Sequence, residues 1–324
     1  WKQYIPHLLK AGLMYISKFN YILPELRAEK GYLNMGKITV QEHLEKNEIR
    51  RLDRLIVNAM GCALNIAFGE SNLAGIITGT GRGCISKLEQ FLVDMNTYSE
   101  SALNPSVFIQ STNNIIGGLI AQKLQLTTYN TTFVNQGLTV LNVLTDVEMK
   151  TLEDSSKKIL FGFFDENTHF NQLIHSQSSF LQSQDGNPII YGEGISFFIA
   201  SQSPKNAIAK IESFEYFPTN QYICAPFEVG VYLDINNIEH PCVFYVGYNN
   251  EYEKERYYLN IVRFATKMNI PLIAYKERTG DFDTSAGVAI ALALEQMAQE
   301  NLKNIYIFNH YKKQSPMAIK LVKS

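Results

Sequence analysis

The alternation of apolar and polar residues predicts a strand, a tight turn and a helix at residues 127–144. Thr127–Val134 is rich in threonine, tyrosine, phenylalanine and valine, side chains that suit a half-buried β-strand. From Leu138 onward, apolar residues recur at spacings that suit a helix buried on most sides. The turn at Asn135-Gln136-Gly137 places Gln136 at the start of this helix, where backbone N–H groups favour negative charge. An enzyme elbow and an ordinary core strand–turn–helix both fit this pattern.

The same patterns along the whole chain predict an α/β protein built from two similar halves. Helices are expected at 42–68, 85–95, 113–124, 253–268 and 284–298, and residues 1–45 are expected to be irregular apart from short helical pieces. In each half a strand and a glycine turn precede a helix, and an elbow later precedes a buried helix. We therefore divide the chain into halves at 1–175 and 189–324, joined by a polar surface segment, 176–188, that is rich in serine and glutamine.

Composition narrows the class of protein. The 324 residues are 46% hydrophobic and 19% charged, with a formal net charge of -2 and no long basic run, which argues against nucleic-acid binding. No apolar run approaches the roughly 18–20 residues that a membrane span requires, and no signal peptide is recognisable. The cysteines show no metal-ligand spacing and predict buried thiols in a reducing cytoplasm, with neither metal nor cofactor: Cys62, Cys84, Cys224 and Cys242.

A few polar residues outside the elbow are candidates for chemistry. Cys84 follows a glycine turn and is the rival nucleophile, although a buried structural thiol explains it better. Asp281 and Asp283 form a close acidic pair; we expect Asp283 to cap the following helix and leave the role of Asp281 open. His169 and His175 have no partner at metal spacing and are expected at the surface.

Several segments, taken in this order, resemble the β-ketoacyl synthases of the thiolase-like superfamily. The resemblance implies a five-layer α/β/α/β/α fold, in which a cysteine nucleophile, two histidines and a glycine-rich oxyanion loop join acyl units. It covers most of the chain, and the segments that support it are TGTGRG (78–83), NPSVFIQSTNNIIGGLIAQKLQL (104–126), YGEGISFFIA (191–200), TGDFDTSAGVAIALAL (279–294) and NIYIFNHYKKQSPMAIKLV (304–322).

The chain departs from that family at each catalytic position. Gln136 stands where the resemblance places the nucleophile, unless the elbow is misaligned and the nucleophile lies elsewhere. Asp281 follows Thr279-Gly280 at one histidine position, and Asn249 lies near the other. Residues 309–313 replace the glycine-rich loop, and the family's opening strand is expected to be missing.

A glutamine at the nucleophile position resembles chain-length factors, the inactive partners of ketosynthases. The resemblance implies a ketosynthase partner in a heterodimer, or a homodimer, and an acyl carrier protein with its acyl chain, in polyketide, aryl-polyene-type pigment or specialised fatty acid synthesis. The alternative is a divergent condensing or acyl-transfer enzyme that uses Cys84 or an acid such as Asp281. The resemblance also implies a dimer interface, whereas the same glycines could instead pack on the chain's own sheet: Gly117, Gly118, Thr128, Tyr129, Asn130 and Thr131.

Overall fold

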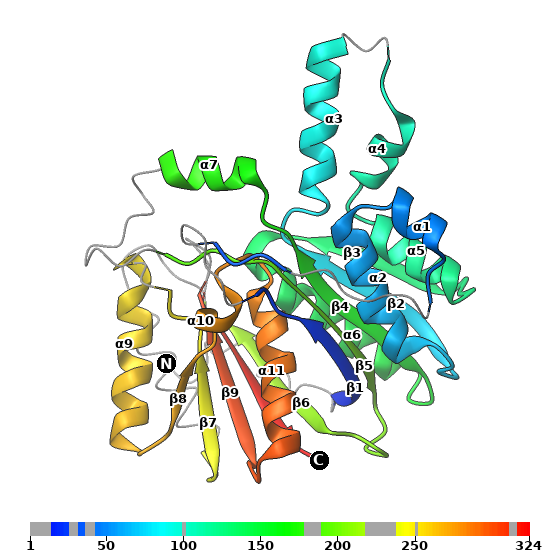
Figure 1. The fold of residues 1–324 in the computed structure, drawn as a ribbon. Helices are drawn as coiled ribbons and strands as arrows, with labels where there is room; N and C mark the ends of the chain where they lie inside the picture. Colours follow the sequence, from blue (N-terminus) through cyan, green and yellow to red (C-terminus); the bar gives the residue numbers. More distant parts are fainter. Residues whose placement is uncertain are drawn as a thin grey trace, which may run out of the picture.

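The computed structural model describes residues 14–25, 32–35, 43–98, 102–177, 189–217, 238–249, 252–310 and 316–324. Within them, ten strands form one mixed sheet in the order β3-β2-β4-β5-β1-β6-β10-β9-β7-β8 (Figure 1). The strands are β1 (Met14–Ile22), β2 (Leu73–Thr80), β3 (Tyr129–Val134), β4 (Lys158–Asp165), β5 (Gly194–Ser201), β6 (Ala209–Tyr216), β7 (Cys242–Val246), β8 (Leu272–Ala274), β9 (Asn304–Asn309) and β10 (Met317–Lys323).

The sheet consists of the same five-stranded unit used twice. Read from the outer edge of the sheet toward its centre, the strands of the first unit follow the order β3-β2-β4-β5-β1. Read in the same way from the other edge, the strands of the second unit follow the equivalent order β8-β7-β9-β10-β6. The directions repeat as well, because β2 is parallel to β3 and β4 as β7 is to β8 and β9, whereas the remaining pairs are antiparallel. The units join through β1 and β6 over only three residue pairs, Met14–Ile16 with Ala209–Ile211. The predicted duplication is therefore confirmed.

Three groups of buried apolar residues define the layers. The central helices α6 (Thr139–Glu153) and α11 (Ser285–Gln299) pack between the strands of both units. Helices α2 (Arg54–Ala67) and α5 (Ile115–Lys123) cover the outer face of the first unit, and α9 (Tyr252–Lys267) covers that of the second (Figure 1). This is the expected α/β/α/β/α arrangement.

The remaining helices lie at the ends of these layers. They are α1 (Lys46–Arg51), α3 (Ile85–Tyr98), α4 (Pro105–Gln110), α7 (His169–Gln177), α10 (Lys276–Thr279) and the short 3-10 turn η1 (Gln136–Leu138). None of the helices in the described ranges is long and apolar enough to cross a membrane.

Several expectations about local structure were wrong. β1 falls in the region expected to be irregular, and it supplies the opening strand that was expected to be missing. The single helix expected at 42–68 is two helices, since Leu52 and Asp53 leave the helical conformation and the Asp53 side chain caps α2. The expected surface position of His169 is confirmed, since it begins α7 and is exposed, whereas the side chain of His175 lies outside the described residues.

The first unit ends and the second begins after β5. Residues 178–188 lie outside the described residues, so a surface connection at 176–188 stays a prediction. β5 comes after that segment, yet it pairs with β4 and β1 in the first unit. The strand order therefore begins to repeat between Ser201 and Ala209.

Candidate functional site

The predicted elbow is present between β3 and α6. Gln136 has a backbone φ of 46°, in the left-handed region that residues other than glycine rarely adopt, and its side chain is exposed. Thr139 fastens the turn, since its Oγ1 accepts from the N–H of Asn135 (2.8 Å) and donates to the carbonyl of Thr80 (3.2 Å). The elbow is thus held against the carboxyl end of β2 while Gln136 is presented outward.

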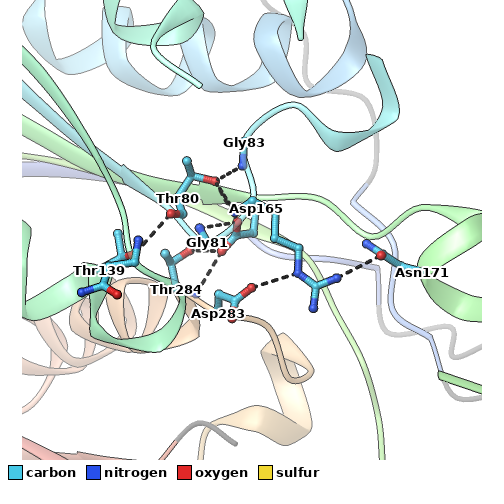
Figure 2. Close-up of polar contacts among 10 residues, drawn as sticks. Thr80, Gly81, Gly83, Thr139, Asp165, Asn171, Asp283 and Thr284 are labelled. Atoms are coloured by element: carbon cyan, nitrogen blue, oxygen red, sulfur yellow. Dashed lines mark hydrogen bonds and ion pairs between the residues drawn. The ribbon is translucent and has the colours of Figure 1, made fainter. Parts of the chain in front are cut away.

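Asp165, at the end of β4, connects the two central helices of the fold. One carboxylate oxygen accepts from the hydroxyl of Thr80 and the N–H of Gly81, both at 2.8 Å. The other accepts from the N–H (3.0 Å) and the hydroxyl (2.7 Å) of Thr284, which immediately precedes α11 (Figure 2). Thr80 also accepts from Thr139 at the start of α6, so one chain of hydrogen bonds joins both helix starts.

Arg82 extends this network toward α7. Its Nε donates to Asp283 Oδ2 at 3.2 Å, and its Nη1 donates to Asn171 Oδ1 on α7 at 2.9 Å (Figure 2). The expectation that Asp283 caps α11 was wrong, because Asp165 receives the N–H of Thr284 instead. No local pattern predicts this contact, since Asp165 lies 119 residues from Thr284.

The two residues at the expected histidine positions are brought into contact. Asn249 Nδ2 donates to Asp281 Oδ2 at 2.7 Å, and Lys276 Nζ lies 2.6 Å from Asp281 Oδ1. All three residues are buried, with exposures of 7%, 3% and 2% for Asn249, Asp281 and Lys276. Sequence reasoning missed Lys276, because its polar segment Lys276–Thr279 has the composition of a surface turn.

Asp281 is held in place by a close contact between two glycine-containing segments. Its N–H donates to the carbonyl of Ile190 (2.8 Å), and its own carbonyl accepts from the N–H of Gly192 (3.2 Å). A Cβ on Gly192 would lie 1.9 Å from the carbonyl oxygen of Thr279, and Gly280 has a φ of 69°. Both positions require glycine, which explains why the YGEG and TGD segments carry it.

Asp165, Arg82, Asp281 and Asp283 line one polar cleft beside the carboxyl ends of β2 and β4, whereas Gln136, Asn249 and Lys276 are not among its lining residues. Its walls include Arg82, Asp165, Glu166, Asn167, Asn171, Tyr191, Gly192, Asp281, Phe282 and Asp283. Burial and the neighbouring carboxylate of Asp283 raise the pKa of Asp165 to about 6. Burial raises the pKa of Glu166 to about 7, although its carboxylate accepts from the N–H of Ser86. The described cleft walls therefore carry more acidic than basic groups.

The described cysteines are poor nucleophiles. Cys62 and Cys84 are buried, and burial raises the pKa of both thiols far above the usual range; at Cys84 the carboxylates of Glu166 and Asp53 raise the pKa further. Burial also raises the pKa of Cys242 to about 11. A thiol reacts as its thiolate, so these environments oppose acyl transfer. Cys224 lies outside the described residues. Among the described residues, no group of His, Cys, Asp and Glu side chains could hold a metal ion.

The residues predicted for an interface lie on β3 and α5 and differ in exposure. Gly117 is buried, and a Cβ there would lie 2.9 Å from Asn130 Oδ1, so this glycine serves packing of α5 on its own β3. Gly118 is exposed, with open space where a Cβ would stand. Thr128, Tyr129 and Asn130 are exposed and Thr131 is half-buried; Tyr129 donates to Asp146 at 3.0 Å and Asn130 to the Gly117 carbonyl at 3.0 Å.

Comparison with known proteins identifies the fold. No family model and no curated protein matches the sequence. Among solved structures, the chain is similar to one of a type II PKS acyl-carrier protein in complex with its ketosynthase bound to the hexaketide (AntDE:AntF), with a TM-score of 0.77 and 12% identity over 97% of this chain and 100% of that chain. The ishigamide ketosynthase/chain length factor gives a TM-score of 0.73 and 15% identity over 96% and 99% of the two chains.

A third structure, a β-ketoacyl synthase from Burkholderia phymatum, gives a TM-score of 0.71 and 9% identity over 97% of this chain and 100% of that chain. The protein therefore has the thiolase-like fold of ketosynthases. At these identities the similarity defines the fold alone.

Proposed function

We propose that this protein is a non-catalytic, chain-length-factor-like subunit that pairs with an active β-ketoacyl-[acyl carrier protein] synthase. The observation that supports this most directly is Gln136, which occupies the elbow with a φ of 46° and an exposed side chain. An amide can donate and accept hydrogen bonds at such a position, but it cannot form a thioester with an acyl chain.

The second part of the site supports the same proposal. Decarboxylative condensation requires groups that stabilise a developing enolate, a role that the histidines fill in ketosynthases. Here Asp281 is buried between Lys276 Nζ (2.6 Å) and Asn249 Nδ2 (2.7 Å). Both carboxylate oxygens are therefore engaged within the protein, and a carboxylate adds negative charge where an enolate needs a donor.

A catalytic role through Cys84 is the second candidate, and its environment argues against it. The thiol is buried, and its pKa is raised by burial and by the carboxylates of Glu166 and Asp53. A catalytic cysteine needs the opposite surroundings, with a nearby cation and access to substrate.

We propose that the ketosynthase partner binds at the edge of the sheet formed by β3. β3 ends the sheet among the described strands, and its sequence YNTTFV contains no charged residue that would discourage pairing with another strand. Exposed Gly118 lies on α5, which packs against β3 through Gly117 and Asn130. A ketosynthase chain with a similar edge would extend the sheet and bring its own elbow near Gln136. The acyl chain held by the acyl carrier protein would then be shaped at this joint.

The test is incubation with acyl carrier proteins loaded with acyl and malonyl groups, followed by intact-protein mass spectrometry. The native protein should show neither an acyl adduct nor a condensation product, whereas an active ketosynthase in parallel shows both. Gln136→Cys should react with a thiol reagent, because the position is exposed, yet still give little condensation, because Asp281 and Asn249 remain. An acyl adduct on a native cysteine, or a condensation product from the native protein alone, would contradict this proposal and support a divergent condensing or acyl-transfer enzyme instead.

A further inference from the structure

The polar cleft carries more negative charge than nearby cations offset. Four acids line it: Asp165, Glu166, Asp281 and Asp283. Asp281 is paired with Lys276 at 2.6 Å. Asp283 is paired with Arg82 at 3.2 Å. Among the described residues, Asp165 and Glu166 form no ion pair, so two carboxylates of the cleft remain without a cation.

The pKa values of Asp165 and Glu166 agree with this surplus of negative charge. Burial is the largest cause of both increases, which bring the pKa of Asp165 to about 6 and that of Glu166 to about 7. A neighbouring carboxylate raises each pKa further, Asp283 at Asp165 and Asp53 at Glu166, and the opposite effect of Arg54 on Glu166 is smaller. A cation in the cleft would stabilise the ionised form of both acids.

Two buried polar atoms of the cleft residues have no hydrogen-bond partner in the described part of the chain. Asp283 is 3% exposed, and its Oδ2 accepts from Arg82 (Figure 2), but its Oδ1 accepts from no donor. Asn167 Nδ2 likewise donates to no acceptor. Leaving such atoms unpaired costs stability, and they usually mark the place of a bound water, ion or ligand. Together they call for an occupant that donates to a carboxylate and accepts from an amide.

The size and the lining of the cleft restrict this occupant further. Its free volume of about 30 Å³ gives room for roughly two water-sized groups. The aromatic residues Tyr191 and Phe282 also line it, and the ring of Tyr191 stacks on that of Tyr32 at 5.8 Å. Aromatic rings and carboxylates both attract cations. Since the described acids, histidines and cysteines form no group that could hold a metal ion, an organic ammonium group fits best.

We propose that the cleft binds a small primary amine that carries a hydroxyl or carbonyl oxygen beside its ammonium group. The ammonium group would donate to Asp283 Oδ1, and its charge would offset the charges of Asp165 and Glu166. The neighbouring oxygen would accept from Asn167 Nδ2. Arg82 binds Asp283 through Oδ2, so it leaves Oδ1 for the ligand. Ordered water is the alternative occupant, since water also donates and accepts, but it brings no charge.

The experiment is saturation-transfer difference NMR of the purified full chain at pH 8 and constant ionic strength, with ethanolamine as the probe. Ethylene glycol is the matched neutral probe, because a hydroxyl group replaces the ammonium group at nearly the same size. Ethanolamine should bind saturably, with a dissociation constant roughly tenfold or more below that of ethylene glycol, because a hydrogen bond to a charged group is stronger than a neutral one.

Two variants each remove one of the proposed contacts. Asp283→Asn keeps an acceptor for Arg82 but removes the charge, so it should raise the dissociation constant of ethanolamine roughly tenfold or more. Asn167→Ala removes the side-chain amide and keeps the backbone N–H that donates to Glu193, so it tests the site even if Asp283→Asn fails to fold. It should raise the dissociation constant roughly threefold. Asp154→Asn, at an exposed position after α6, is the matched control and should bind ethanolamine as the native chain does.

Three results would overturn the inference. Equal binding of ethanolamine and ethylene glycol would mean that the cleft holds neutral groups or water. Native affinity in both Asp283→Asn and Asn167→Ala would place the amine elsewhere on the protein. A lack of saturable ethanolamine binding by the native chain would mean that the cleft binds no such amine. None of these results depends on acylation or on a ketosynthase partner, so the proposed function is tested separately.

Discussion

At the scale of single residues, the buried acids have structural roles that their positions in the sequence do not predict. Asp165 receives four hydrogen bonds and joins the starts of α6 and α11. Asp281, the candidate acid, is engaged by Lys276 and Asn249. Glu193 is fully buried and holds Arg54 through two contacts at 2.5 and 2.7 Å. These buried acids therefore hold separate segments of the chain together.

Glu166 gives a testable pH dependence. Its folded pKa of about 7 lies above the ordinary value of 4.5, so the folded state favours the protonated form. The stabilisation from protonated Glu166 is complete below pH 4.5 and is lost as the pH rises through 7. Glu166→Gln keeps an acceptor for the Ser86 N–H without ionising, so at pH 8 it should be more stable than the native protein by roughly 2–3 kcal/mol.

Urea unfolding at several pH values measures this difference. The gain from Glu166→Gln should shrink steadily between pH 8 and pH 5, and Glu153→Gln, at an exposed glutamate on α6, should change little at any pH. A gain for Glu166→Gln that is constant with pH would show that ionisation of Glu166 is not its cause.

At the scale of elements, α5 has one glycine turned inward and one turned outward. Gly118→Ala should raise the free energy of unfolding by roughly 0.5–1 kcal/mol, because alanine favours a helix and the new methyl group meets open space. Gly117→Ala should give no such gain, since its Cβ would lie 2.9 Å from Asn130 Oδ1. Denaturant titrations of the two variants under dilute, monomeric conditions compare them directly. Equal gains would mean that α5 is rotated relative to β3.

At the scale of the whole molecule, the two units share their interior. α6 and α11 belong to different units but pack in one buried cluster with strands of both. Asp165 of the first unit also binds Thr284 of the second. Neither unit can unfold without exposing the central layer of the other, so the fold should behave as one cooperative domain.

Differential scanning calorimetry should therefore show a single unfolding transition, with a calorimetric enthalpy equal to the van't Hoff enthalpy. Asp165→Ala should lower the transition temperature without splitting it, because the buried apolar cluster to which α6 and α11 both belong remains. Two separate transitions would instead indicate units that are stable alone.

The sequence by itself determined the elements whose side-chain periodicity is local. Apolar runs and regular spacing located most helices and strands, the duplicated unit and the elbow at Gln136, since these depend on neighbours within a few residues. β1 escaped because its pairing with β5 shifts register between Ile16 and Lys18, which interrupts the alternation that marks a strand.

Only the tertiary structure decided which polar residues meet. Asn249, Lys276 and Asp281 come together from a strand end, a short helix and a glycine turn, and Thr80, Asp165 and Thr284 come from three separate elements. Such contacts leave no periodic trace in the sequence. Whether an acid is solvated, paired with a lysine or used as a cap depends on the burial and donors around it, which exist only once the chain has folded.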